Sequence, residues 1–169
     1  MLSLRPGAYY RSIFHIDLER LKQQGFRAIL LDLDNTMVPW NDPEPTPELL
    51  AWLQRVREMG FQVCIVSNNK GRRVREFATR LGIPFVSKAI KPRRKGFREA
   101  MALLQVPPRE CVVVGDQLFT DILGGNRAGA HTILVMPMDR REFLFTRLVR
   151  TVERKVLRYL DRRGLLRQE

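Results

Sequence analysis

Short apolar runs alternate with amphipathic segments along most of this chain. Apolar runs bounded by turn residues predict buried strands, whereas apolar residues recurring at three- and four-residue steps predict helices. On this basis we predict strands over 27–33, 61–66, 83–86, 111–114 and 131–136, and helices over 17–24, 46–59, 72–81, from 92 to about 104, and from 116 to about 128. Regular strand–helix alternation is typical of an α/β fold. The pattern therefore predicts a three-layer, doubly wound parallel sheet with right-handed crossovers.

The C-terminal part of the chain has a different pattern. From about 140 to 162, one apolar stripe recurs at helical spacing, and Arg and Lys fill much of the remaining surface. The chain thus divides into a domain over 1–137, which includes an N-terminal helical segment, and a basic amphipathic helical extension over 138–169. Such a helix can pack its stripe on the domain or lie in the headgroup region of an anionic membrane. The pattern leaves both possibilities open.

Polar residues follow directly after four of the predicted strands. In a parallel sheet the carboxyl ends of the strands meet at one edge, where ligands bind. Carboxylates close together repel each other unless a cation lies between them, and Mg2+ with a phosphate ester is the usual case. We expect a site at this edge built from Asp32, Asp34 and Thr36 after the first strand, Ser67, Asn68 and Asn69 after the second, Lys91 after the third, and Asp116, Thr120 and Asp121 after the fourth.

Composition narrows the class of protein. The 169 residues are 44% hydrophobic and 28% charged, which is ordinary for a globular domain. No window is apolar enough to span a bilayer and the N-terminus has no secretory signal, so we expect a cytoplasmic protein. Cys64 and Cys111 both lie in apolar runs, which predicts buried free thiols in a reducing compartment.

The net charge of +12 is concentrated in particular segments. Residues 70–98 contain eleven Lys or Arg and a single acid, Glu76. A basic field of this kind attracts polyanions, which include nucleic acid, an anionic membrane surface and a multiply charged substrate. The charge alone does not choose among these partners.

Two motifs carry a resemblance to a known family. D-x-D-x-T follows the first strand over 32–36, and G-D-x-x-x-T-D follows the fourth over 115–121, with Ser67 and Lys91 between them in order. Residues from about 26 to 135 thereby resemble the haloacid dehalogenase superfamily of phosphohydrolases. The intervals between the motifs have no room for the cap domain that many relatives insert. The resemblance therefore implies an open, capless site that admits a bulky substrate.

The resemblance implies roles for the acidic residues. Asp32 would be the nucleophile that forms an aspartyl-phosphate. Asp34 would protonate the leaving alkoxide and then activate the hydrolytic water. Mg2+ would be held by Asp32, the backbone carbonyl of Asp34, Asp116 and Asp121, the last of these acting on the metal or its waters.

The resemblance also implies how phosphate is bound. Ser67 and the backbone N–H of Asn68 would bind phosphate oxygens, while Lys91 would offset the charge of the phosphoryl group and of Asp32. Lys88 lies only three residues before Lys91 and is an alternative. We favour Lys91 because Lys-Pro before a helix matches the third motif of the family.

The segments that flank the motifs point to one group within this superfamily. Residues 4–25, 31–40 and 115–122 look like the YqeG-type group of subclass IIIA, which is similar to the phosphatidylglycerophosphate phosphatases of mitochondria and plastids. This implies removal of the terminal phosphate from an anionic lipid headgroup, by a protein peripheral on the inner face of the membrane. Two alternatives remain open: a basic RNA- or ribosome-associated protein whose phosphatase site is idle or secondary, and a phosphatase acting on nucleic-acid ends or phosphoproteins.

Overall fold

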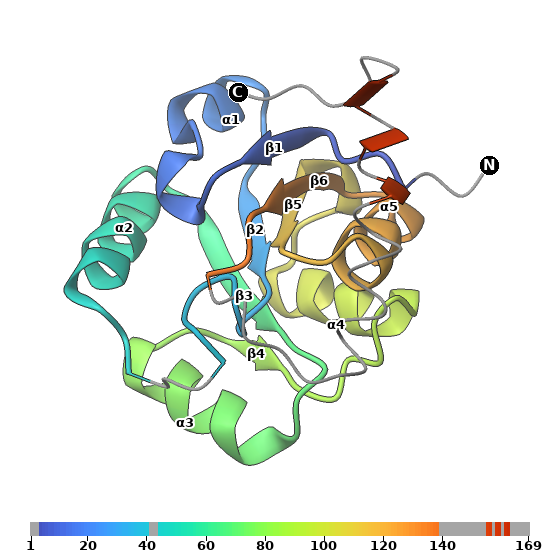
Figure 1. Ribbon diagram of the computed structural model, residues 1–169. Helices are drawn as coiled ribbons and strands as arrows, with labels where there is room; N and C mark the ends of the chain where they lie inside the picture. The colour runs from blue at the N-terminus through green and yellow to red at the C-terminus, as the bar shows by residue number, and fades with distance from the viewer. Residues whose placement is uncertain (1–3, 41–43, 139–154, 157, 160, 163–169) are drawn as a thin grey trace.

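The structure, a computed structural model, describes residues 4–40, 44–138, 155–156, 158–159 and 161–162. Within these residues lies a six-stranded, all-parallel sheet in the order β1-β6-β5-β2-β3-β4, with helices on both faces (Figure 1). The strands are β1 (Ala8–Tyr10), β2 (Ala28–Leu31), β3 (Gln62–Val66), β4 (Phe85–Val86), β5 (Cys111–Gly115) and β6 (His131–Val135). The helices are α1 (Leu18–Gln23), α2 (Pro47–Glu58), α3 (Gly71–Leu81), α4 (Arg94–Leu104) and α5 (Leu123–Ala128). The predicted three-layer, doubly wound parallel fold is confirmed.

Each face of the sheet has its own apolar core. Successive side chains of a strand point to opposite faces. In β2, Ile29 and Leu31 pack with residues of α1, α2 and α3, whereas Ala28 and Leu30 pack with residues of α4 and α5 (Figure 1). All four residues are fully buried, so β2 appears in the sequence as a continuous apolar run.

The helix starts follow from local sequence. At α1, the side chain of Asp17 accepts a hydrogen bond from the N–H of Arg20 at 2.9 Å. At α2, Oγ1 of Thr46 accepts from the N–H of Leu49 at 3.2 Å, and Pro47 occupies the first helical position. These caps satisfy N–H groups that have no partner within the helix, which is why short polar side chains mark both starts in the sequence.

Strand β1 differs from the prediction, which placed only a helical segment near the N-terminus. Its three residues pair with β6, with Ala8 opposite Ile133 and Tyr10 opposite Val135. So short a segment contains no apolar run that sequence reasoning could recognise. Pairing with β6 gives this segment backbone hydrogen-bond partners that are distant in the sequence.

The helix predicted after the fourth strand also differs in detail. Leu118–Ile122 forms a π-helical turn that leads directly into α5. Within α5, a Cβ on Gly124 would lie 2.4 Å from Cε2 of Phe97 in α4. Glycine at this position therefore lets the two helices approach closely.

The two cysteines are buried and free, as predicted. Burial raises the pKa of Cys64 to about 12 and that of Cys111 to about 11. Both thiols are therefore protonated and unreactive at neutral pH.

Most of the predicted C-terminal helix, over about 140–162, lies outside the described residues. Residues 155–156, 158–159 and 161–162 are helical. Val156 and Tyr9 pack against a small cluster formed by Leu118, Ile122 and Leu134. This part of the extension thus contacts the domain. Across the described part of the chain, none of the helices has the length and apolar character that crossing a membrane requires.

The carboxyl edge of the sheet carries no inserted domain in the described residues. Between Thr36 and Ser67 the described residues form α2 and β3, and between Ser67 and Lys91 they form α3 and β4. Neither interval contains an inserted domain in the described residues, in agreement with the capless arrangement predicted from the motif spacing. The loops at this edge surround a cleft of about 460 Å³.

Candidate active site

A tight loop at the tip of β2 carries two carboxylates. The N–H of Asp32 donates to the carbonyl of Val114 at 2.9 Å, so Asp32 continues the hydrogen bonding between β2 and β5. The chain then turns at Asn35, whose φ of 63° lies in the left-handed region that Asn tolerates. The N–H of Asn35 closes the loop by donating to the carbonyl of Val38 at 2.7 Å. The turn places Asp32 and Asp34 together at the carboxyl edge of the sheet.

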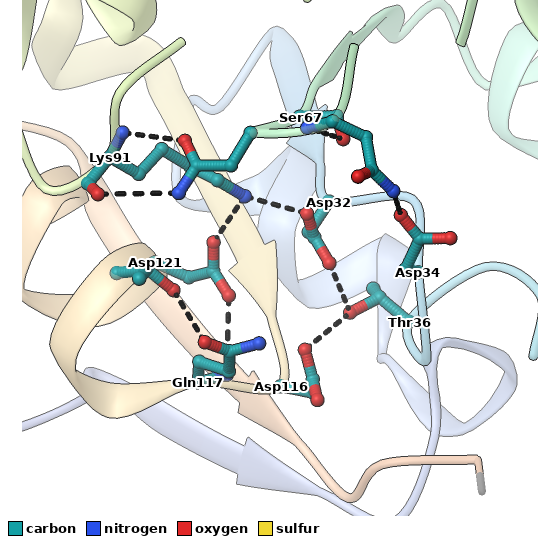
Figure 2. A network of polar contacts seen from close by, with 11 residues as sticks. Asp32, Asp34, Thr36, Ser67, Lys91, Asp116, Gln117 and Asp121 are labelled. Carbon is teal, nitrogen blue, oxygen red and sulfur yellow. Dashed lines mark hydrogen bonds and ion pairs between the residues drawn. The ribbon is translucent and has the colours of Figure 1, made fainter. Parts of the chain in front are cut away.

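Lys91 lies at the centre of the site (Figure 2). Its Nζ donates to Oδ1 of Asp32 and to Oδ1 of Asp121, at 2.6 Å in each case. The Lys91 side chain is only 2% exposed, whereas Lys88 is exposed to solvent. Of the two lysines considered from sequence, the structure therefore places Lys91 beside Asp32.

The tip of β3 holds the backbone of Lys91 in place. Oδ1 of Asn68 accepts from the Lys91 N–H at 2.7 Å, and Nδ2 of Asn68 donates to the Lys91 carbonyl at 3.3 Å. Ser67 is buried, and its Oγ accepts from the N–H of Asn69 at 3.1 Å. The three residues predicted to bind phosphate, Ser67, Asn68 and Lys91, thus lie together, and the Asn68 side chain fixes the lysine.

Three carboxylates gather at the cleft, one of which lines it. Asp32, Asp116 and Asp121 each offer an oxygen, and these oxygens all lie within 4.8 Å of one another. The Thr36 hydroxyl lies between two of these acids, 3.4 Å from Oδ2 of Asp32 and 3.4 Å from Oδ1 of Asp116. Lys91 contacts two of the three carboxylates, so its single charge leaves the group with an excess of negative charge. Hard oxygen ligands with unbalanced negative charge fit a divalent cation such as Mg2+.

Gly115 makes room for one of these acids. A Cβ on Gly115 would lie 2.2 Å from Cγ of Asp121. Oδ2 of Asp121 accepts from the N–H of Gln117 at 3.2 Å, which holds the carboxylate over the end of β5 (Figure 2). A side chain at position 115 would collide with the Asp121 carboxylate, which explains why glycine precedes Asp116 in the fourth motif.

Burial shapes the charge state of the site. It raises the pKa of Asp32 to about 7, an effect that the positive charge of Lys91 opposes and the negative charges of Asp121 and Asp34 reinforce. For Lys91, burial alone would lower the pKa, but attraction to Asp121 and Asp32 outweighs it and raises the pKa above its usual value. Lys91 is therefore charged at every physiological pH, whereas Asp32 ionises near neutrality when no metal is bound.

Asp34 has a different set of partners. Nδ2 of Asn69 donates to its Oδ2 at 2.5 Å, and Nη2 of Arg73 pairs with its Oδ1 at 2.8 Å. Sequence reasoning did not identify Asn69 and Arg73 as partners of Asp34. The available signal was that α3 begins almost directly after the tip of β3, so that its first turn reaches the same edge of the sheet.

The cleft brings most of the predicted residues to one surface. Asp116 and Asp121 are buried and are not among the residues that line it. Asp34 lines the cleft, although its side chain is not part of the three-carboxylate cluster found in the described residues. The lining residues are Asp32, Asp34, Asn35, Trp40, Ser67, Asn68, Asn69, Arg73, Lys91, Gln117 and Thr120.

The raised pKa of Asp32 makes cation binding depend on pH. Below pH 7 the metal-free carboxyl is largely protonated, so a divalent cation must displace a proton in order to bind. We expect the affinity for Mg2+ to fall by up to about tenfold per pH unit as the pH drops below 7. Mg2+ titrations followed by calorimetry at pH 8 and pH 6 measure this effect.

Asp32→Asn is the matched control for the titration. The neutral amide has no proton to release, so its weaker binding should change little between the two pH values. Equal affinity of the wild type at pH 8 and pH 6 would show that the cation displaces no proton from Asp32.

Comparisons with known proteins agree with this geometry. Residues 7–129 match the family of haloacid dehalogenase-like hydrolases. The chain is similar to a probable phosphatase, YqeG, from Bacillus subtilis, with 47% identity over 164 residues that cover 97% of this chain and 95% of that protein. It is also 29% identical, over 95% of this chain, to phosphatidylglycerophosphate phosphatase 1, chloroplastic/mitochondrial, from Arabidopsis thaliana. The matched region makes up 49% of the plant enzyme, so the chain spans about half of that protein's length.

A solved structure supports the fold. An uncharacterized protein from Listeria monocytogenes serotype 4b aligns with a TM-score of 0.54 over 70% of this chain and 86% of that one. The identity is 21%, so this likeness shows the fold alone. The family match spans both aspartate motifs and most of the chain. The chain therefore belongs to the haloacid dehalogenase-like hydrolase family, as a phosphatase of the YqeG type.

Proposed function

We propose that this phosphatase is a Mg2+-dependent phosphomonoester hydrolase that acts through an aspartyl-phosphate on Asp32, and that its substrate is phosphatidylglycerophosphate. The observation that carries the chemistry is the position of Asp32. Its carboxylate lines the cleft, contacts the buried ammonium of Lys91 at 2.6 Å, and belongs to the three-carboxylate cluster. The Asp32 carboxylate can therefore act as a nucleophile while it contacts a fixed positive charge and belongs to a cation site. Phosphoryl transfer requires this combination.

The proposed reaction has two steps. In the first, a carboxylate oxygen of Asp32 bonds to phosphorus while the bond to the alkoxide breaks, and Asp34 gives a proton to the departing oxygen. In the second, Asp34 takes a proton from water, which attacks the aspartyl-phosphate and releases inorganic phosphate. Asp32, the backbone carbonyl of Asp34, Asp116 and Asp121 would hold Mg2+. The bound cation would offset negative charge on the phosphoryl oxygens.

The tip of β3 and Lys91 would bind the phosphoryl group. Ser67 lies on the cleft, and the backbone N–H of Asn68 follows it on the loop that faces Asp32. We assign these groups to the phosphoryl oxygens. Because Lys91 is buried and permanently charged, it supplies positive charge without having to rearrange as the reaction proceeds.

The lipid assignment rests on three observations. The chain resembles the plant phosphatidylglycerophosphate phosphatase along nearly its whole length. No inserted domain covers the carboxyl edge in the described residues, and this arrangement suits a substrate anchored in a bilayer. The segment over 70–98, which supplies Lys91, is strongly basic and suits an anionic surface.

Phosphate release from phosphatidylglycerophosphate in mixed micelles tests this function. We expect release with Mg2+ and none with a chelator. Hydrolysis of an aryl phosphate without hydrolysis of the lipid would keep the phosphatase and reject the lipid. RNA 3′-phosphates and phosphopeptides in the same assay test the other substrate classes. Inactivity on every substrate, with salt-dependent RNA binding, would instead favour a basic binding protein.

Two exposed apolar side chains, one on the cleft and one next to a cleft residue in the sequence, suggest how the protein meets a bilayer. Trp40 lines the cleft and is 37% exposed, and Ile90, directly before Lys91, is 57% exposed. The φ of Ile90 is 53°, a left-handed conformation that a β-branched residue rarely adopts. We propose that these two exposed apolar side chains, with the basic segment over 70–98, contact an anionic lipid surface.

We expect Ile90→Asn to reduce binding to vesicles that contain phosphatidylglycerol by about tenfold, because an exposed apolar anchor is lost. Asn tolerates left-handed backbone, so the variant should be at least as stable as the wild type. Vesicle co-sedimentation and thermal melting measure both effects.

Leu103→Asn is the matched control for Ile90→Asn. Leu103 is 55% exposed but lies at the end of α4 that leads back to the amino edge of the sheet, away from the cleft. Its substitution should leave vesicle binding unchanged. An equal loss in both variants would argue against a specific membrane contact at the mouth of the cleft.

A further inference from the structure

Arg73 is the second cation of the cleft. Among the described residues that line it, only Lys91 and Arg73 carry positive charge. Lys91 is buried against Asp32 and Asp121, whereas the Arg73 side chain is 29% exposed. The two cations therefore serve different parts of the cleft, and Arg73 can reach a ligand that enters from solvent.

The contacts of Arg73 place it on the leaving-group side of the reaction. Its Nη2 pairs with Oδ1 of Asp34 at 2.8 Å and donates to the carbonyl of Pro39 at 3.3 Å. Asp34, in its proposed role, contacts the oxygen that leaves with the alcohol. A guanidinium bound to Asp34 is thus close to whatever the leaving alcohol carries, whereas Lys91 is close to the phosphoryl group itself.

Arg73 does not use its full set of donors in this arrangement. Its Nε is buried and has no hydrogen-bond partner among the residues that the structure describes. A buried N–H without a partner is unfavourable, because it has lost its hydrogen bonds to water. A small movement of the guanidinium from Asp34 toward an anion in the cleft would give this donor a partner and would leave Asp34 available to the departing oxygen.

We propose that Arg73 forms a second anion subsite, which binds the phosphodiester that the leaving alcohol of a lipid headgroup carries. The inference rests on the proposed function and names a part of its substrate that Ser67 and Lys91 do not bind. A phosphatidylglycerophosphate headgroup has two phosphates joined by glycerol, and cleavage of one leaves the other on the alcohol. The planar guanidinium suits this second anion because it can present two N–H donors to two oxygens.

The test uses two soluble substrates with the same kind of leaving group. One is the deacylated headgroup, glycerophosphoglycerol phosphate, and the other is glycerol 3-phosphate, which lacks the second phosphate. Because neither forms a bilayer, general attraction to a membrane does not contribute. The readout is the ratio of the two kcat/KM values, in which any shared effect of a substitution on Asp34 cancels.

We expect Arg73→Ala to lower this ratio by about tenfold or more, mainly through a higher KM for the headgroup, and Arg73→Lys to restore part of it. Arg72→Ala is the matched control. Arg72 lies on the same helix, but its side chain is 92% exposed and pairs with Glu76 at 2.9 Å. Its removal takes away the same charge and should leave the ratio unchanged. Thermal melting checks that each variant is folded.

The outcomes separate the subsite from the proposed function. An equal loss on both substrates in Arg73→Ala would show that the arginine only positions Asp34, and the subsite would be wrong. A wild type without preference for the headgroup would also overturn it, even if micellar phosphatidylglycerophosphate is hydrolysed. A wild type that hydrolyses glycerol 3-phosphate but neither the headgroup nor the lipid would reject the lipid substrate and the subsite together.

Discussion

Replacing Asp32 by Asn should abolish phosphate release, lowering kcat by about 10⁴-fold or more, because an amide cannot form the aspartyl-phosphate. The amide has the shape of the carboxylate, and its oxygen can still accept from Lys91. The loss should therefore appear in turnover with the fold intact. Steady-state assays with an aryl phosphate and with micellar phosphatidylglycerophosphate, both with Mg2+, measure it.

The same substitution should not destabilise the metal-free protein. Burial raises the pKa of Asp32 to about 7, above its value in an unfolded chain. A carboxyl with a raised pKa contributes its stability fully below about pH 4 and loses it as the pH rises through 7. The neutral amide avoids that loss. Asp32→Asn should therefore melt at or above the temperature of the metal-free wild type at pH 8.

Asp34→Asn separates the role proposed for Asp34 as proton donor from the role proposed for Asp32 as nucleophile. An aryl phosphate releases a stable phenolate that needs little protonation, so this variant should retain more activity on the aryl phosphate than on the lipid. Asp32→Asn should lose both activities equally. If Asp32→Asn kept more than about a hundredth of wild-type turnover on either substrate, covalent catalysis at this carboxylate would be wrong.

The fold could be predicted where local chemistry determines the structure. The buried strands β2 and β5 appear as apolar runs because both faces of each are covered, and Asp17 and Thr46 mark helix starts because their side chains cap N–H groups. Strand β1 could not be predicted, since its pairing with β6 depends on an edge that exists only after the sheet has assembled.

The same distinction holds for the candidate site, where some contacts could be predicted from the sequence and others could not. Asp32, Asp34 and Lys91 follow strand ends, and parallel strands bring their ends together, so their proximity could be expected from sequence. The contact between Arg73 and Asp34 could not, because it depends on the direction in which α3 leaves the β3 tip and on the path of a long side chain. Arg72 and Arg73 are adjacent and alike in sequence, yet only Arg73 reaches the cleft. Helix rotation separates their roles, and a run of basic residues does not show that rotation.

Replacing Lys91 by Met should destabilise the protein by about 3–5 kcal/mol and lower the melting temperature by about 10 °C, as well as remove activity. Lys91 contacts Asp32 and Asp121 at 2.6 Å, and the side chain of Asp121 is only 2% exposed. Without the ammonium, two carboxylates in a poorly solvated site lose their partner and repel each other. Metal-free thermal melting at pH 8, above the pKa of about 7 that Asp32 has in the wild type, measures the effect.

Lys88→Met is the control for this substitution, because it removes the same charge three residues away from an exposed position and should change the stability by less than about 0.5 kcal/mol. Mg2+ should raise the melting temperature of Lys91→Met more than that of the wild type, since a cation between the carboxylates replaces part of the lost charge. Adding Asp121→Asn should recover stability for the same reason, because one of the two unpaired charges disappears. A Lys91→Met protein that melts within about 2 °C of the wild type would contradict the central position of this lysine and would return Lys88 to consideration.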